Sequence, residues 1–117
     1  MRKPPFYKSL LNSILGVVWM LKSERNFQIE ILGLIVNLFL IAFLQLNATD
    51  TALILIVSFA VLSLEILNTA AEKISDIIQP EFDERIKIIK DIAAGAVVLM
   101  SFAAVCVGIL VYWKYIF

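Results

Sequence analysis

Apolar segments separated by short polar ones make up most of the chain. Over about residues 6–22, apolar side chains recur at the spacing of one helical face, with lysine and asparagine among them. This segment is amphipathic and short for a membrane span, so we expect a helix that lies on the membrane surface. Pro4 and Pro5 precede it, at a position where proline is tolerated.

Three longer apolar runs follow the first segment. Their expected boundaries are about residues 27–46, 51–78 and 86–115. With their polar ends included, all three are long enough to cross a bilayer, which takes about 20 mostly apolar residues. In the second run the apolar part alone, Ala52 to Leu64, is ~20 Å long, short of the ~30 Å hydrocarbon core, so the polar part must begin inside the membrane. The pattern therefore predicts an all-α membrane protein in which one surface helix precedes three transmembrane helices, as a single domain over residues 1–117.

The polar turns between the runs carry residues that begin and end helices. We expect Thr49 or Asp50 to cap the second span, because their side-chain oxygens can accept a free backbone N–H. Pro80 is expected to end that span, since proline cannot continue a helix. Asp83 is the expected N-cap of the third span.

Composition agrees with this reading and removes several kinds of chemistry. The chain has 62% hydrophobic residues, where a soluble domain has about 45–50%. It contains no histidine and a single cysteine, Cys106, in an apolar run. A zinc hydrolase, a haem protein and a disulfide scaffold are therefore not expected.

The distribution of Lys and Arg predicts the orientation. Cations flank the first span on its N-terminal side and surround the connector between the second and third spans, whereas the turn at residues 47–50 has none. The cations that set this orientation are Arg2, Lys3, Lys8, Lys22, Arg25, Lys73, Arg85, Lys87 and Lys90. The positive-inside rule places the N-terminus and the connector in the cytoplasm and the C-terminus outside the bacterial cytoplasmic (inner) membrane. Lys114 is the one exception.

A polar stripe follows the apolar half of the second span. Glu65, Asn68, Glu72 and Asp76 are spaced i, i+3, i+7 and i+11, so they lie within ~60° of one another on one helical face. A carboxylate at membrane depth costs roughly 2.5–3.5 kcal/mol, which marks Glu65 as a functional residue. The shallower carboxylates could instead be a solvated extension of the helix, and Asn68 could bond a neighbouring helix.

A second charged cluster surrounds the start of the first span. Glu24 is expected at nearly the depth of Glu72, and two carboxylates from different helices suit Mg²⁺ bound together with phosphates and water. Lys90 and Asp91 open the third span at the same cytoplasmic level, where a lysine can neutralise phosphate charge. Taken alone, each of these could be an ordinary charged helix end. No glycine-rich phosphate loop is present in the sequence.

Three segments together carry a resemblance to a known family. They are Glu24-Arg-Asn-Phe27, Glu65-Ile-Leu-Asn-Thr-Ala-Ala-Glu72 and Lys90-Asp-Ile-Ala-Ala-Gly-Ala-Val97. In wording, order and spacing they resemble the small prokaryotic diacylglycerol kinase/undecaprenol kinase family, and the likeness covers essentially the whole chain. The resemblance implies an integral-membrane lipid kinase that uses ATP and Mg²⁺ and forms a homotrimer with active sites shared between subunits.

The resemblance also implies roles for individual residues. Glu65 matches the catalytic base, and Glu24 and Glu72 match the metal-binding pair. The positions that match nucleotide contacts are Asn12, Glu24, Glu72, Glu81, Asp83, Lys90 and Asp91, and those that match supporting positions around the substrate are Asn68, Glu30 and Asp76. One departure is Pro5, which stands where some members have an arginine that helps to hold ATP.

The expected reaction is therefore phosphorylation of a membrane lipid alcohol. Residues 24–27 and 90–97 are closer to the undecaprenol kinase branch, and the predicted neighbours of Glu65 are mostly apolar, so undecaprenol is the expected acceptor and diacylglycerol the alternative. An ion- or proton-coupled transporter subunit would also contain intramembrane carboxylates, but it predicts polar residues through the whole membrane thickness. No nucleic-acid partner is expected.

Overall fold

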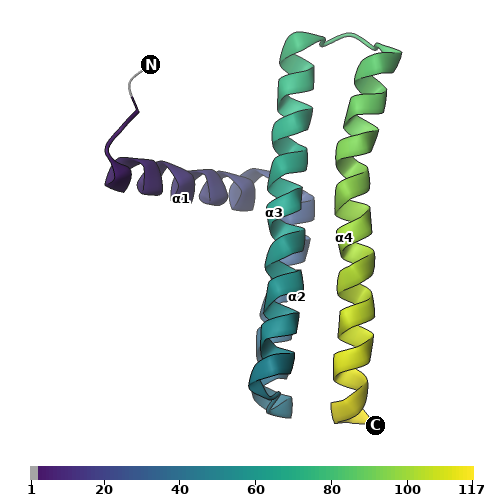
Figure 1. Ribbon diagram of the computed structural model, residues 1–117. Coiled ribbons are helices and arrows are strands. Elements are labelled where there is room, and N and C mark those ends of the chain that lie inside the picture. Colours follow the sequence, from purple (N-terminus) through teal and green to yellow (C-terminus); the bar gives the residue numbers. More distant parts are fainter. Residues whose placement is uncertain (1–2) are drawn as a thin grey trace.

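Four helices form the described part of the chain, residues 3–117 of a computed structural model, and no strand occurs within that range (Figure 1). They are α1 (Phe6–Ser23), α2 (Arg25–Leu44), α3 (Ala48–Ile78) and α4 (Glu84–Ile116). Helices α2, α3 and α4 are long and apolar enough to cross a membrane. The predicted surface helix and three spans are confirmed as helices, while Arg2 lies outside the described residues.

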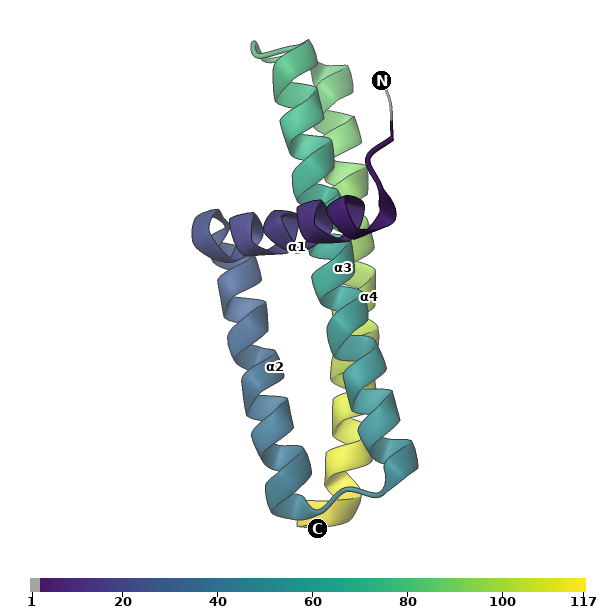
Figure 2. The ribbon, with the colours of Figure 1, turned by 90° about the vertical axis from the view of Figure 1, so that its left-hand side faces the viewer.

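Helix α1 runs across the other three helices rather than along them (Figure 2). Figure 2 shows α1 running across the bundle, with α2 descending from its end and α3 and α4 continuing past it toward the 79–83 connector. Helices α3 and α4 lie side by side along most of their length (Figure 1). An amphipathic helix that runs across the spans has the geometry expected of a helix in the membrane interface. The ends of α3 and α4 near the connector extend beyond the level of α1 (Figure 2).

Glu24 forms the corner between α1 and α2. Its backbone is extended (φ −110°, ψ 114°), so it ends one helix and precedes the next. The Gln28 side chain donates to the Leu21 carbonyl at 2.9 Å and braces the bend. Below the corner, Met20, Phe27 and Leu62 pack together as a buried cluster. The α1–α2–α3 junction is thus fixed by packing at the point where the first charged cluster lies.

The turn between α2 and α3 differs from the prediction. Helix α2 ends at Leu44, because Gln45 adopts a left-handed conformation (φ 55°). The N-cap of α3 is Asn47, whose Oδ1 accepts the Asp50 N–H at 2.8 Å. The prediction that Thr49 or Asp50 caps this helix was wrong, because the Asp50 carboxylate accepts bonds from α4 instead.

The 79–83 connector follows the prediction more closely. Helix α3 ends at Ile78, just before Pro80, and Asp83 caps α4 by accepting the Arg85 N–H at 2.8 Å. The Arg85 guanidinium also pairs with Asp83 at 2.8 Å, and these bonds lower the pKa of Asp83 to about 2. Helix α4 begins at Glu84, two residues before the expected start of the third span, so Lys87, Lys90 and Asp91 lie in its first turns.

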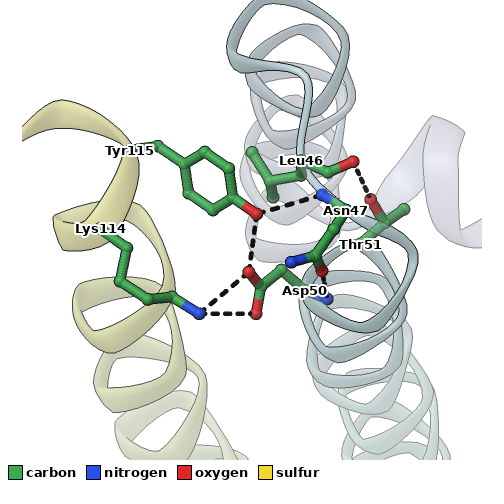
Figure 3. A network of polar contacts seen from close by, with 6 residues as sticks. All are labelled: Leu46, Asn47, Asp50, Thr51, Lys114 and Tyr115. Atoms are coloured by element: carbon green, nitrogen blue, oxygen red, sulfur yellow. Dashed lines mark hydrogen bonds and ion pairs between the residues drawn. The ribbon is translucent and has the colours of Figure 1, made fainter.

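A buried carboxylate ties the far end of α4 to the α2–α3 turn (Figure 3). Asp50 is only 4% exposed. Its two oxygens lie 3.0 Å from the Lys114 Nζ, and the Tyr115 hydroxyl donates to one of them at 2.7 Å. The Tyr115 oxygen in turn accepts the Asn47 N–H at 3.1 Å. This arrangement explains Lys114, the exception to the charge rule, because its charge is paired with Asp50.

Removing this carboxylate should destabilise the protein. We expect Asp50→Ala to lower the free energy of unfolding by about 2 kcal/mol, the usual cost of losing hydrogen bonds to a charged group. The measurement is helix loss followed by circular dichroism during SDS titration. Asp91→Ala, which breaks the exposed Lys87–Asp91 pair, should cost less than about 1 kcal/mol. Equal effects of the two changes would contradict a special role for the Asp50 contacts.

Candidate active site

Glu65 lies at the junction of α1, α2 and α3. It is on α3, one turn beyond the buried Leu62, and only 5% of it is exposed. A carboxylate so enclosed loses most of its hydration, which is costly unless neighbouring groups compensate. This low exposure is consistent with the prediction that Glu65 is the deepest carboxylate of the polar stripe on α3.

Helix α2 places two side chains against the Glu65 carboxyl group. Asn26 and Glu30 are four residues apart, so they lie on the same face of α2, and both are near the Glu65 carboxyl group. Glu24 and Glu72 lie close enough to interact with its charge. The extended backbone at Glu24 and the continuous helix at Glu72 thus bring carboxylates from two elements toward Glu65.

Asn68 and Glu72 are linked within α3. The Asn68 amide donates to the Glu72 Oε1 at 3.3 Å, and Asn68 is 8% exposed. This bond stays within one helix, so Asn68 does not make the interhelical bond considered as an alternative. Within residues 3–117, the Asn68 Oδ1 and the Glu30 Oε2 are buried side-chain oxygens that accept no hydrogen bond. Unpaired buried oxygens are costly, and two of them beside Glu65 and Glu72 indicate a place for a donor or a cation.

The carboxylates of this group suit a hard cation only together with further ligands. In the described part of the chain, no three His, Cys, Asp or Glu side chains come together as a metal-binding set. Glu24 and Glu72 could supply two oxygens, and phosphate oxygens and water would have to supply the rest. That division is typical of Mg²⁺ sites that also bind nucleotide phosphates. The unpaired Asn68 oxygen beside Glu72 fits the same chemistry.

A second polar group lies where α3 and α4 approach the connector. The Lys90 Nζ is 2.5 Å from the Asp76 Oδ1, and the Lys87 Nζ is 2.7 Å from the Asp91 Oδ2. A cavity of about 230 Å³ lies beside these pairs. Its lining comprises Asp76, Gln79, Pro80, Glu81, Phe82, Asp83, Ile86, Lys87, Lys90 and Asp91. Five predicted site residues therefore share one cavity.

The two groups are joined by the polar stripe on α3. Asp76 is one helical turn beyond Glu72 and ~17 Å along the helix from Glu65. Asn12, in contrast, is exposed on α1 and does not line the connector cavity. The structure thus gathers Glu24, Glu30, Asn68 and Glu72 around Glu65, and gathers the α4 residues farther along, beside the 79–83 connector.

The sequence reasoning missed two contacts of this region. Asn26 had no assigned role, although its i, i+4 spacing to Glu30 could have indicated a shared face of α2. On α1, Trp19 lies under the Lys73 ammonium group, 5.6 Å from ring centroid to Nζ. This contact fixes α1 against α3 beside the stripe.

Comparison with known proteins gives a consistent family. A family model described as "Prokaryotic diacylglycerol kinase" matches residues 11–112. A Synechocystis protein named diacylglycerol kinase is 38% identical over 94 residues, which is 80% of this chain and 54% of that protein. A Bacillus subtilis protein named undecaprenol kinase is 30% identical over 107 residues, covering 92% of this chain and 87% of that protein. The chain therefore spans about half the length of the first relative and most of the second.

Proposed function

The chain belongs to the prokaryotic diacylglycerol kinase family, a family of lipid kinases, and we propose that it phosphorylates a membrane lipid alcohol with ATP and Mg²⁺. The observation that carries this proposal is the buried Glu65 with Glu24 and Glu72 nearby. These groups lie where the interfacial helix α1 meets the spans, which is the depth of a lipid hydroxyl. The same family membership favours a kinase over the transporter considered as an alternative.

Glu65 is the proposed general base. The hydroxyl of the lipid alcohol gives its proton to a Glu65 carboxylate oxygen as its own oxygen bonds to the γ-phosphorus of ATP. The bond from that phosphorus to the bridging oxygen breaks, and the electron pair leaves with ADP. Burial makes Glu65 a stronger hydrogen-bond acceptor than an exposed carboxylate.

Glu24 and Glu72 are the proposed ligands of Mg²⁺. When bound, the ion would neutralise phosphate oxygens and orient the γ-phosphoryl group. Asn68 holds Glu72 through the bond described above and keeps an oxygen free on the same side. Glu65 thus supplies the oxygen that accepts the proton of the alcohol, and Glu24 and Glu72 supply the anionic oxygens for the metal.

The connector cavity is the proposed nucleotide site. Lys90 and Lys87 lie on one wall, and Glu81 and Asp83 come from the connector. In this structure each lysine is paired with a carboxylate, and these exposed pairs are weak. A phosphate can therefore replace Asp76 as the partner of Lys90. Asp76 and Asp91 then remain available to bond the nucleotide or the two lysines of the cavity.

The proposed assembly is a homotrimer with shared sites in the bacterial cytoplasmic membrane. Only 6% of the apolar window of α4 and 11% of that of α2 is buried within the chain, so these spans present wide faces to lipid or to other subunits. In such an assembly Asn12 of α1 is expected to reach the nucleotide. The N-terminus, α1 and the connector face the cytoplasm, and the C-terminus lies outside.

Undecaprenol is the proposed acceptor, and diacylglycerol is the second candidate because the relatives carry both names. The test compares kcat/KM for undecaprenol and dioleoylglycerol with purified protein in one detergent. We expect a preference of at least about tenfold for undecaprenol, the effect of roughly 1.4 kcal/mol. A tenfold preference for diacylglycerol would contradict the acceptor assignment and leave the kinase proposal intact.

A further inference from the structure

A cleft leads from the Glu65 group along the spans, away from the 79–83 connector. It has a volume of about 320 Å³ and is bounded by α2, α3 and α4. Glu30 lies at one end and Asn37 and Ser58 at the other. Glu30 and Asn37 are seven residues apart on α2, so the cleft extends ~10 Å along the membrane normal.

The cleft is continuous with the site of the proposed reaction. Glu30 lines it and also lies against the Glu65 carboxyl group. A lipid alcohol with its hydroxyl at Glu65 therefore has its chain at the mouth of this cleft. Small residues keep the walls apart, because Gly33 lines the cleft and a Cβ added there would meet no atom within 4 Å.

The volume of the cleft suits part of a single hydrocarbon chain of a lipid. At about 30 Å³ for a group the size of a water molecule or a methylene, 320 Å³ holds roughly ten such groups. Ten carbons are two isoprene units of one polyprenyl chain. A diacylglycerol carries two acyl chains, of which only one could enter.

The outer end of the cleft is polar, although it lies within the spans. The Tyr112 hydroxyl donates to the Asn37 Oδ1 at 2.9 Å, and the Asn37 Nδ2 donates to the Ser58 Oγ at 3.2 Å. These two bonds join α4, α2 and α3 and hold the amide in one orientation. An amide nitrogen has two N–H groups, so one is left for the occupant of the cleft.

We propose that this cleft takes the first isoprene units of the acceptor and that Asn37, held by Tyr112 and Ser58, selects an unsaturated isoprenoid chain over a saturated one. A carbon–carbon double bond offers π electrons to an N–H group, whereas a saturated chain offers no acceptor and leaves the amide unpaired. This inference rests on the proposed function and names the acceptor class of that site.

The first experiment fills the cleft. Gly33→Leu puts a side chain into open space, so the helix should tolerate it, and we expect kcat/KM for geranylgeraniol to fall at least tenfold. The matched control is Gly108→Leu on α4, where an added Cβ also meets nothing within 4 Å and which does not line the cleft. We expect it to stay within twofold of wild type, with helix content by circular dichroism checking both.

The second experiment tests whether the protein distinguishes an unsaturated lipid chain from a saturated one. Geranylgeraniol and phytol share a carbon skeleton and an allylic hydroxyl, but phytol lacks the later double bonds. Weak hydrogen bonds to π electrons contribute about 0.5–1 kcal/mol, so the wild type should prefer geranylgeraniol by about threefold in kcat/KM. Asn37→Leu should abolish the preference and Tyr112→Phe should reduce it. Tyr115→Phe, which removes a tyrosine hydroxyl at the Asp50 contacts instead, should keep it.

The outcomes separate the two proposals. Protein that phosphorylates no lipid alcohol removes the proposed function and this inference with it. Active protein in which Gly33→Leu behaves like Gly108→Leu, or in which Asn37→Leu keeps the wild-type preference, overturns the inference alone.

Discussion

Glu65→Gln is expected to lower the rate of phosphoryl transfer at least about 100-fold, the lower end for loss of a general base. Glutamine keeps the size of the side chain, but it cannot accept the proton of the lipid hydroxyl. The measurement is turnover of undecaprenol with radiolabelled ATP at saturating Mg²⁺. KM for ATP should change little, because the proposed nucleotide cavity lies farther along α3.

A matched change elsewhere serves as the control for Glu65. Glu84→Gln alters an exposed glutamate in the first turn of α4, and it should leave turnover within about twofold of wild type. Both variants should show wild-type helix content and elute as the same assembly. Turnover of the folded Glu65→Gln protein close to that of wild type would rule out Glu65 as the base.

Glu24→Gln and Glu72→Gln are each expected to raise the Mg²⁺ concentration needed for half-maximal rate by at least about tenfold. Each change removes one charged oxygen from the proposed ion, and the amide oxygen that replaces it is a weaker ligand for a hard cation. The measurement is the initial rate as a function of Mg²⁺ at fixed ATP. Excess Mg²⁺ should recover part of the activity of each single variant.

The double variant distinguishes a shared ion from two separate roles. Residues that act as a unit are strongly non-additive, so Glu24→Gln combined with Glu72→Gln should be little worse than the more damaging single change. Losses that multiply, with no change in the Mg²⁺ dependence, would show that the two glutamates do not hold one ion.

The helices and most of their ends could be predicted from the sequence because they depend on local features. Apolar runs of span length, the helix end before Pro80 and the Asp83 cap each involve residues close together in the chain. The start of α3 could not be predicted in this way. Asn47 and Asp50 are both good capping residues, and the choice depended on Lys114 and Tyr115, which are more than 60 positions away.

The candidate site shows the same division. That Glu65, Asn68, Glu72 and Asp76 share a face of α3 follows from helical spacing alone. The expected depth of Glu65 follows from the short apolar run before it. Which side chains surround Glu65 depends on the angle at Glu24, where α1 turns into α2 and brings Asn26 and Glu30 against α3. That angle is set by packing of Met20, Phe27 and Leu62.

The sequence by itself therefore determined the kind of protein, its helices and the polar face of α3, since these depend on composition and on spacing within one helix. Only the tertiary structure decided which charged side chains pair and where a cleft lies between α2, α3 and α4. In the sequence, Asn37 and Ser58 are isolated polar residues in apolar runs, and Tyr112 lies near the end of another such run. Their hydrogen bonds join three helices, because a polar group within a membrane must find its partner on whichever helix packs beside it.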